Sequence, residues 1–242
     1  MTKGLYIYLI LFFVAFTGCS PDAESENSTE IEPNLNAESN KVIRISTPTD
    51  IRGFAHLKNI MEKAYNKLGF KVEFITLPAV RSMHDTDEGV HADAEFIRTK
   101  IVEGQMKNSI RIPIPISTID FCAVVKDSKI KIQKWEDFNQ YSVAIIKGYV
   151  LSENKITGSN VLKTENSEQA LSMLQSGRVQ VAALVKTEAN FLIELHGYEK
   201  LKICPDSVEK IKVYHYINKK HKNLVPQLTE AFKELTGNEV EN

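Results

Sequence analysis

Two arginines, Arg81 and Arg98, flank a short apolar segment over residues 90–96 that is expected to be a buried strand. Each guanidinium is a planar fork of N–H donors that matches a carboxylate and stays charged at any physiological pH. We therefore expect the two arginines to hold the anionic group of a small solute. The alternative is that they are surface charges or members of structural ion pairs.

The sequence lacks the usual catalytic and metal-binding patterns. Asp93 and Glu95 could form an acid–base pair, but the simpler interpretation is an acid at a strand end that holds Arg98 or caps a helix. The six histidines are scattered, and His84 and His91 have no third ligand. No nucleophile, zinc or dinucleotide motif occurs. We predict that the chain is not an enzyme and uses no cofactor and no metal.

An α/β unit is expected to position the arginines. Residues 41–46 and 70–77 have the composition of strands, and apolar residues recur at helical spacing over 54–68 until Gly69. A strand–helix–strand unit implies a parallel strand pair with a right-handed crossover.

The loops that leave these two strands contain further candidate residues. Ligands in open α/β sheets bind outside the carboxyl ends of the strands. Asp50 and Phe54 follow the first strand, and the turn 78–81 follows the second. Thr49 or Asp50 is also expected to cap the helix.

Residues 110–116 are apolar at every other position and include Pro113 and Pro115. A proline cannot donate to a β-ladder, so the segment is expected to be an edge strand or a crossing segment. Residues 119–125 form a strong strand pattern.

Further along the chain, a strand is expected over 142–147. It leads through a turn at Gly148 into a helix, where backbone N–H groups can approach an anion.

The order of three motifs resembles a known family. These motifs are a Pro-x-x-Arg at 78–81, a Gly-x-x-x-Asp-x-Glu-x-x-Arg at 89–98 and an Ile-Pro-x-Pro-Ile at 112–116. They look like the bacterial family 3 extracellular solute-binding proteins, and the similarity runs over about residues 42–237. The resemblance implies an α/β, two-lobed type 2 periplasmic-binding-protein fold with a two-strand hinge.

The resemblance also implies the lobe boundaries. Residues 41–121 and 217–242 would form lobe 1, and residues 122–216 would form lobe 2. The chain would cross the hinge at about 121–127 and return along the strand 211–217.

A ligand site follows from the same resemblance. Arg81 and Arg98 would hold an anionic group, Phe54 or Tyr149 would cover the apolar part of the ligand, and the Gly148 turn would complete the site when the lobes close. The expected ligand is small and polar, amino-acid-like or carboxylated. The expected partner is the permease of an ABC transporter, in amino acid transport, or a sensor, and the chain itself is expected to be a monomer.

One departure from the family affects the expected ligand. Amino-acid receptors of this family often carry an acid in the last strand of lobe 2 or at its exit, but residues 179–185 contain none. Glu188 could substitute, although a solvated helix position is the preferred interpretation. A standard α-amino acid is therefore in doubt. Two other functions stay open, a dehydratase-type enzyme on the same fold and a sensory or scaffolding lipoprotein with a degenerate pocket.

The first forty residues predict export and anchoring. An apolar run over 5–16 is too short to span a membrane and has the length of a signal-peptide core, and it ends at Gly18-Cys19. We expect residues 1–18 to be a signal peptide, Cys19 to be lipidated, and residues 19–40 to be a disordered acidic tether. The protein would then lie in the periplasm, attached to a bacterial membrane. The alternative is an ordinary secreted protein with Cys19 removed.

Charge and cysteine usage narrow the partners further. Residues 20–40 contain six acids and no base, which leaves 29 bases and 25 acids from Lys41 onward and a charge of about +4. That excess suits an anionic or zwitterionic solute and is too weak to predict nucleic-acid binding. Cys122 and Cys204 are expected to be buried free thiols rather than a disulfide.

Overall fold

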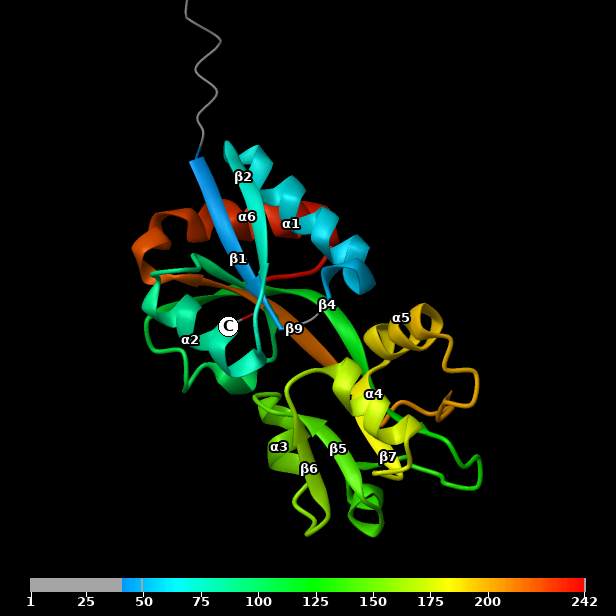
Figure 1. Ribbon diagram of the computed structural model, residues 1–242. Helices are drawn as coiled ribbons and strands as arrows, with labels where there is room; N and C mark the ends of the chain where they lie inside the picture. The colour runs from blue at the N-terminus through cyan, green and yellow to red at the C-terminus, as the bar shows by residue number, and fades with distance from the viewer. Residues whose placement is uncertain (1–40, 49, 242) are drawn as a thin grey trace, which may run out of the picture. The chain divides into compact units, whose positions relative to one another are not determined.

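The computed structural model describes residues 41–48 and 50–241 (Figure 1). The predicted signal peptide, Cys19 and the tether lie outside the described residues. The strands form one nine-stranded sheet in the order β2-β1-β3-β9-β4-β7-β5-β6, with β8 paired to β4. Their bounds are β1 Lys41–Thr47, β2 Phe70–Thr76, β3 Ala94–Arg98, β4 Ser109–Val125, β5 Val143–Ile146, β6 Val161–Thr164, β7 Val181–Val185, β8 Lys202–Ile203 and β9 Glu209–Asn218.

Helices cover the sheet and join its strands. The α-helices are α1 Ala55–Lys67, α2 Ala79–Glu88, α3 Val150–Lys155, α4 Ser167–Gln175, α5 Lys186–His196 and α6 Val225–Thr236. The 3-10 turns are Ile51–Phe54, Lys100–Val102, Trp135–Gln140 and Lys219–Leu224. We use "the β1 half" for β1, β2 and β3 with α1, α2 and α6, and "the β5 half" for β5, β6 and β7 with α3, α4 and α5.

The opening β1–α1–β2 unit confirms the predicted parallel strand pair. β1 and β2 are parallel and in register from Lys41↔Phe70 to Thr47↔Thr76. The Asp50 side chain accepts a hydrogen bond from the Arg52 backbone N–H at 2.9 Å and so caps the turn that leads into α1. Gly69, at φ +79°, ends the helix in the left-handed region that favours glycine.

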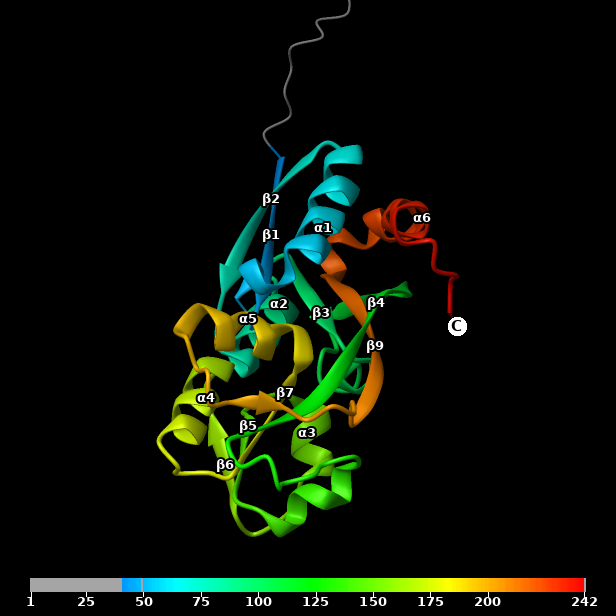
Figure 2. The ribbon, with the colours of Figure 1, turned by 90° about the vertical axis from the view of Figure 1, so that its right-hand side faces the viewer.

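The two faces of β1 carry different side chains, as the alternation of a strand requires. Ile43 and Ile45 join the apolar core that includes Met61 of α1, whereas the Ser46 hydroxyl bonds Thr86 Oγ1 of α2 at 2.7 Å. Helices α1 and α6 contact each other on the apolar side, and α2 lies on the other (Figures 1 and 2).

Two long antiparallel strands, β4 and β9, connect the halves (Figure 2). Their pairing runs from Ser109↔Asn218 to Phe121↔Glu209, and from Phe121 onward β4 also pairs with β7. The sheet therefore continues from one half to the other through this pair. The exact lobe boundaries stay predictions.

The proline-containing part of β4 is an edge, as predicted. Residues 109–120 have β9 as their only ladder partner within the described chain, and the register shifts on either side of Pro115. The other side of this segment meets the C-terminal tail, because the Asn238 amide donates to the Pro115 carbonyl at 2.7 Å and the Glu241 N–H donates to the Pro113 carbonyl at 2.7 Å.

The prediction for the segment between the two arginines was wrong in its boundaries. β3 begins at Ala94, not at residue 90, because Gly89 ends α2 at φ +69° and Val90 is 59% exposed. Arg98 is the last residue of β3 and does not open a helix; the short 3-10 turn Lys100–Val102 follows it. The sheet, and not a helix, therefore sets the position of the Arg98 side chain.

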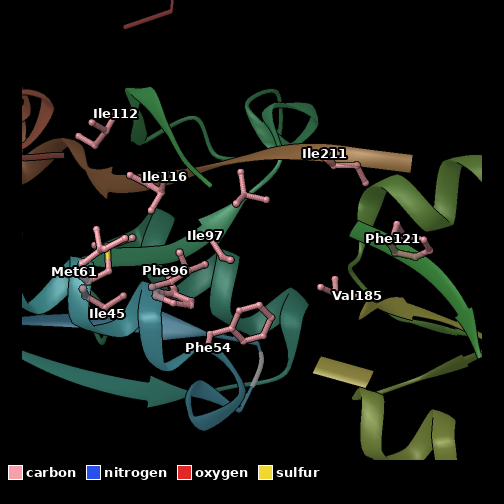
Figure 3. Close-up of a cluster of buried hydrophobic side chains, with 14 of the residues drawn as sticks. Ile45, Phe54, Met61, Phe96, Ile97, Ile112, Ile116, Phe121, Val185 and Ile211 are labelled. Carbon is pink, nitrogen blue, oxygen red and sulfur yellow. The ribbon is translucent and has the colours of Figure 1, made fainter. Parts of the chain in front are cut away.

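The main apolar core extends through both halves (Figure 3). Phe54 and Phe96 pack edge to face with ring centroids 6.3 Å apart, and Figure 3 shows Phe121 and Val185 on the other side of the same cluster. A second cluster lies between β5, β7 and the helices α4 and α5. Cys122 and Cys204 are buried and free, as predicted.

Candidate functional site

Arg98 is the most constrained of the predicted site residues. It is 6% exposed, and three of its N–H groups already have partners. Nε donates to Glu95 Oε1 at 2.7 Å, Nη2 donates to the Ala79 carbonyl at 2.8 Å, and Nη1 lies 3.5 Å from the Gly148 carbonyl. The guanidinium therefore connects the start of α2 in the β1 half with the β5–α3 turn in the β5 half.

Glu95, and not Asp93, is the acid that holds Arg98. Glu95 is fully buried, and its Oε2 accepts hydrogen bonds from Ser82 Oγ at 2.6 Å and Ser46 Oγ at 2.9 Å. The prediction that an acid of this segment holds Arg98 is confirmed.

Asp93 precedes the strand and belongs to a different cluster. It bonds the Arg44 N–H at 2.9 Å, Lys220 Nζ at 2.6 Å and His221 Nε2 at 3.1 Å. Burial raises the pKa of Asp93, but the hydrogen bonds from Lys220, Arg44 and His221 outweigh it and leave the pKa below its usual range. Since Asp93 and Glu95 have separate partners, they do not form an acid–base pair.

A cavity of about 80 Å³ lies beside Arg98. Its walls are largely apolar and come from both halves of the molecule. They include Phe54, Ile97, Val102, Phe121, Leu151 and Val185. Gly148 and Tyr149 also line it, so the structure brings together four of the predicted site residues: Phe54, Arg98, Gly148 and Tyr149.

Gly148 allows the two halves to approach closely. Its φ is +84°, and a Cβ at this position would lie 2.8 Å from Val80 Cγ2 and 2.9 Å from Val80 N. A second contact between the halves lies at Gly53, where a Cβ would be 3.2 Å from the ring of Phe191 on α5. The Arg52 guanidinium lies over the same ring at 5.6 Å.

Glu188 was wrongly predicted to be solvated. It is 3% exposed and lies next to buried Ala189 on α5, which begins directly after β7. The Tyr149 hydroxyl donates to Glu188 Oε2 at 3.5 Å. Burial raises the pKa of Glu188 to about 7. Burial, followed by the charge of Glu188, raises the pKa of Tyr149 well above its usual value.

Asp50 and Arg81 do not line the cavity. Asp50 pairs with Arg52 at 2.6 Å, and the hydrogen bond from the Arg52 side chain is the main reason why the pKa of Asp50 is lowered. The Arg81 side chain is 65% exposed and lies 3.5 Å from Asp85 on the same helix. A role for either residue in ligand binding stays a prediction.

The site offers no metal centre. Over residues 41–48 and 50–241, no group of three or more His, Cys, Asp and Glu side chains is placed to hold a metal ion. Within the same residues no helix is both long and apolar enough to cross a bilayer. The lining of the cavity offers the guanidinium of Arg98, hydroxyl groups and apolar side chains.

No family model and no curated protein matches the sequence. Solved structures do match the fold. A truncated, arginine-bound form of ArgBP from T. maritima has a TM-score of 0.69 at 16% identity, over 82% of this chain and 98% of that one. The substrate-binding protein of an amino acid ABC transporter has a TM-score of 0.65 at 20% identity, over 81% of this chain and 92% of that one.

A third similar structure is a sensor. A histidine kinase sensor domain with similarity to periplasmic binding proteins has a TM-score of 0.71 at 13% identity, over 81% of this chain and 90% of that one. At these identities the likeness is one of fold. The chain has the α/β, two-lobed type 2 fold of periplasmic binding proteins, with β4 and β9 as its two connecting strands.

Proposed function

We propose that this protein is a solute-binding lipoprotein that captures a small carboxylated or amino-acid-like ligand in the cavity beside Arg98. One observation carries the proposal: a buried arginine is fixed at a cavity whose walls come from both halves of the molecule. Such a site is complete only when the halves meet, so binding and closure favour each other.

The partner would be an ABC permease, and the protein would be held at a bacterial membrane in the periplasm by lipid on Cys19. The support for this setting is the apolar run ending at Gly18-Cys19, the acidic stretch that follows it, and the likeness to a transporter's substrate-binding protein.

A second candidate function is ligand sensing for a partner kinase or scaffold. The likeness to a histidine kinase sensor domain favours it. Sensing and transport both require the cavity to bind the ligand. They differ in the partner protein that recognises the closed, ligand-bound form. Deletion of the gene would separate them: loss of uptake of the ligand supports transport, and loss of a transcriptional response with unchanged uptake supports sensing.

The binding proposal is tested by calorimetric titration of the full chain in detergent with amino acids, short carboxylic acids and dicarboxylates. The matched variant is Glu95→Gln with Arg98→Met, which removes both charges and leaves none unpaired. Arg178→Gln is the control, because that side chain is exposed and does not line the cavity. Binding that is lost in the double variant and kept in the control supports the proposal, and a panel without any binding solute contradicts it.

A further inference from the structure

Within the described chain, the lining of the cavity beside Arg98 contains no acid, because Glu95, the counter-charge of Arg98, does not line the cavity. Among the described residues that line it, Arg98 is the one ionised side chain, and the other polar side chains are those of Thr99, Tyr149 and Ser152. Such a cavity favours a solute that brings a negative charge and discriminates against one that brings a positive charge.

Arg98 retains donors for a solute. Glu95, Ala79 and Gly148 occupy three of the five guanidinium N–H groups, which leaves two. Two N–H groups at the ends of the fork can bind both oxygens of one carboxylate. Arg98 cannot swing away from the cavity without breaking the 2.7 Å pair with Glu95, so this donor pair is preorganised.

Neither nearby acid is placed to receive an ammonium group. Glu95 already accepts from Arg98, Ser46 and Ser82, with Thr86 Oγ1 at 3.5 Å as a fourth donor, so its lone pairs are taken. Glu188 does not line the cavity, and its carboxylate accepts a hydrogen bond from the Tyr149 hydroxyl. Burial raises the pKa of Glu188 to about 7, so its carboxyl is a weaker counter-charge for an ammonium than an ordinary glutamate. Val185, which ends β7 and lines the cavity, has no polar atom in its side chain.

The size of the cavity limits the ligand. A volume of about 80 Å³ is small beside the roughly 300–1,000 Å³ of common ligand pockets. The walls around it are aliphatic and aromatic, with Phe54, Leu151 and Val185 among them. The body of the ligand is therefore short and apolar.

We propose that the ligand is a small carboxylate with a short apolar body and no amino group, such as a branched short-chain acid or its α-keto derivative. This inference rests on the proposed function and narrows its ligand class. The carboxylate binds the two remaining N–H groups of Arg98, and the apolar body fills the space between Phe54 and Val185.

Four compounds test the inference: isovalerate, α-ketoisovalerate and valine, which share one five-carbon skeleton, and isobutylamine, which is valine without its carboxylate. They are titrated into the full chain in detergent at pH 7. Isovalerate or α-ketoisovalerate is expected to bind at least about tenfold more tightly than valine, because valine brings an unpaired ammonium into the cavity. Isobutylamine, which lacks the carboxylate, is expected not to bind.

A gain-of-function variant tests the same charge argument independently. Val185→Asp places an acid in the lining, and Val185→Asn places a neutral side chain of the same shape there. The ratio of valine to isovalerate affinity is expected to rise at least about tenfold in Val185→Asp and to stay near the wild-type ratio in Val185→Asn. If Val185→Asp does not fold, the wild-type ranking of the four compounds decides alone.

The outcomes separate this inference from the proposed function. Valine or isobutylamine binding as tightly as isovalerate overturns the ligand class and leaves the solute-binding function intact. The same holds if only larger solutes, such as arginine or glutamine, bind. If no solute in either panel binds, the proposed function fails as well.

Discussion

The guanidinium of Arg98 and the carboxylate of Glu95 form an ion pair with an Nε–Oε1 distance of 2.7 Å, and their side chains are 6% and 0% exposed. The two residues are three positions apart on one short strand, β3. Glu95 also receives two serine hydroxyl hydrogen bonds, from β1 and α2. The pair therefore fixes the position of the arginine relative to two elements of the β1 half before any ligand arrives.

Glu95→Gln is expected to lower the free energy of unfolding by about 3–5 kcal/mol, because it leaves the buried Arg98 without a counter-charge. Urea unfolding at pH 7 measures the change. Glu73→Gln, at an exposed position on β2, is the control and should stay within about 0.5 kcal/mol of wild type. Equal effects of the two substitutions would contradict a structural role for the pair.

The sequence predicted the elements whose signals are local. Helical spacing with Gly69 as a stop placed α1, and the prolines at 113 and 115 marked an edge of the sheet. Four of the six predicted ligand-binding residues line one cavity, because the carboxyl ends of parallel strands meet at one edge.

The sequence could not predict contacts that depend on tertiary packing. Nothing in the sequence near Glu188 indicates burial; its 3% exposure depends on the packing of α5 and on its neighbour Tyr149, which is distant in the sequence. The Ala79 and Gly148 carbonyls at Arg98 are backbone atoms, and their positions have no signature in residue type. Val90 was wrongly assigned to a strand because its apolar character does not distinguish a strand from an exposed turn.

Gly148→Ala is expected to destabilise the protein by about 1–3 kcal/mol more than Gly177→Ala. Both glycines have a positive φ, +84° and +75°, so both variants incur backbone strain. Only a Cβ at Gly148 meets a neighbour, Val80, while Gly177 has nothing within 4 Å. Thermal unfolding measures the difference, and small-angle scattering should show a larger radius of gyration for Gly148→Ala alone. Equal destabilisation by the two variants would mean that the contact between the halves is unimportant.

Glu188 should make stability fall as pH rises. Its pKa is about 7 in the folded state against 4.5 for an ordinary glutamate, so the folded protein binds more protons than the unfolded chain between these values. Unfolding free energy therefore decreases from about pH 4.5 to pH 7 and then levels.

Glu188→Gln removes this dependence. The variant is expected to match wild type near pH 4 and to exceed it by a few kcal/mol above pH 7. Urea unfolding at a series of pH values measures the difference, in which the contributions of all other groups cancel. Glu194→Gln, an exposed position on the same helix, should track wild type throughout. A constant difference at all pH values would show that Glu188 does not titrate in this range.

His215 and Tyr65 form a buried hydrogen bond of 2.7 Å between Nε2 and the phenol. His215 Nδ1 lies 3.1 Å from the Phe96 carbonyl, which can only accept, so Nδ1 carries the proton and Nε2 accepts from Tyr65. Burial holds the pKa of His215 at about 4 and keeps the ring neutral. Tyr65→Phe should cost about 1–3 kcal/mol, measured by urea unfolding. In Tyr141→Phe, the control, no hydroxyl hydrogen bond is lost and little change is expected.

The C-terminal tail covers the outer edge of β4 at Pro113 and Pro115. These two prolines determine whether the edge can pair with a second copy once the tail is removed. A residue in a strand points its N–H and C=O to the same side, so Pro113 and Pro115, whose carbonyls face the tail, present acceptors and no donors at this edge. Truncation after Gly237 removes both hydrogen bonds and should lower the free energy of unfolding by about 1–3 kcal/mol.

The truncated chain should nevertheless stay monomeric, because an edge without donors pairs poorly with a second copy. Pro113→Ala with Pro115→Ala restores the donors and should cause the truncated chain to associate, as measured by light scattering after size exclusion. Association of the truncated chain with its prolines intact would show that the tail, and not the prolines, protects the edge.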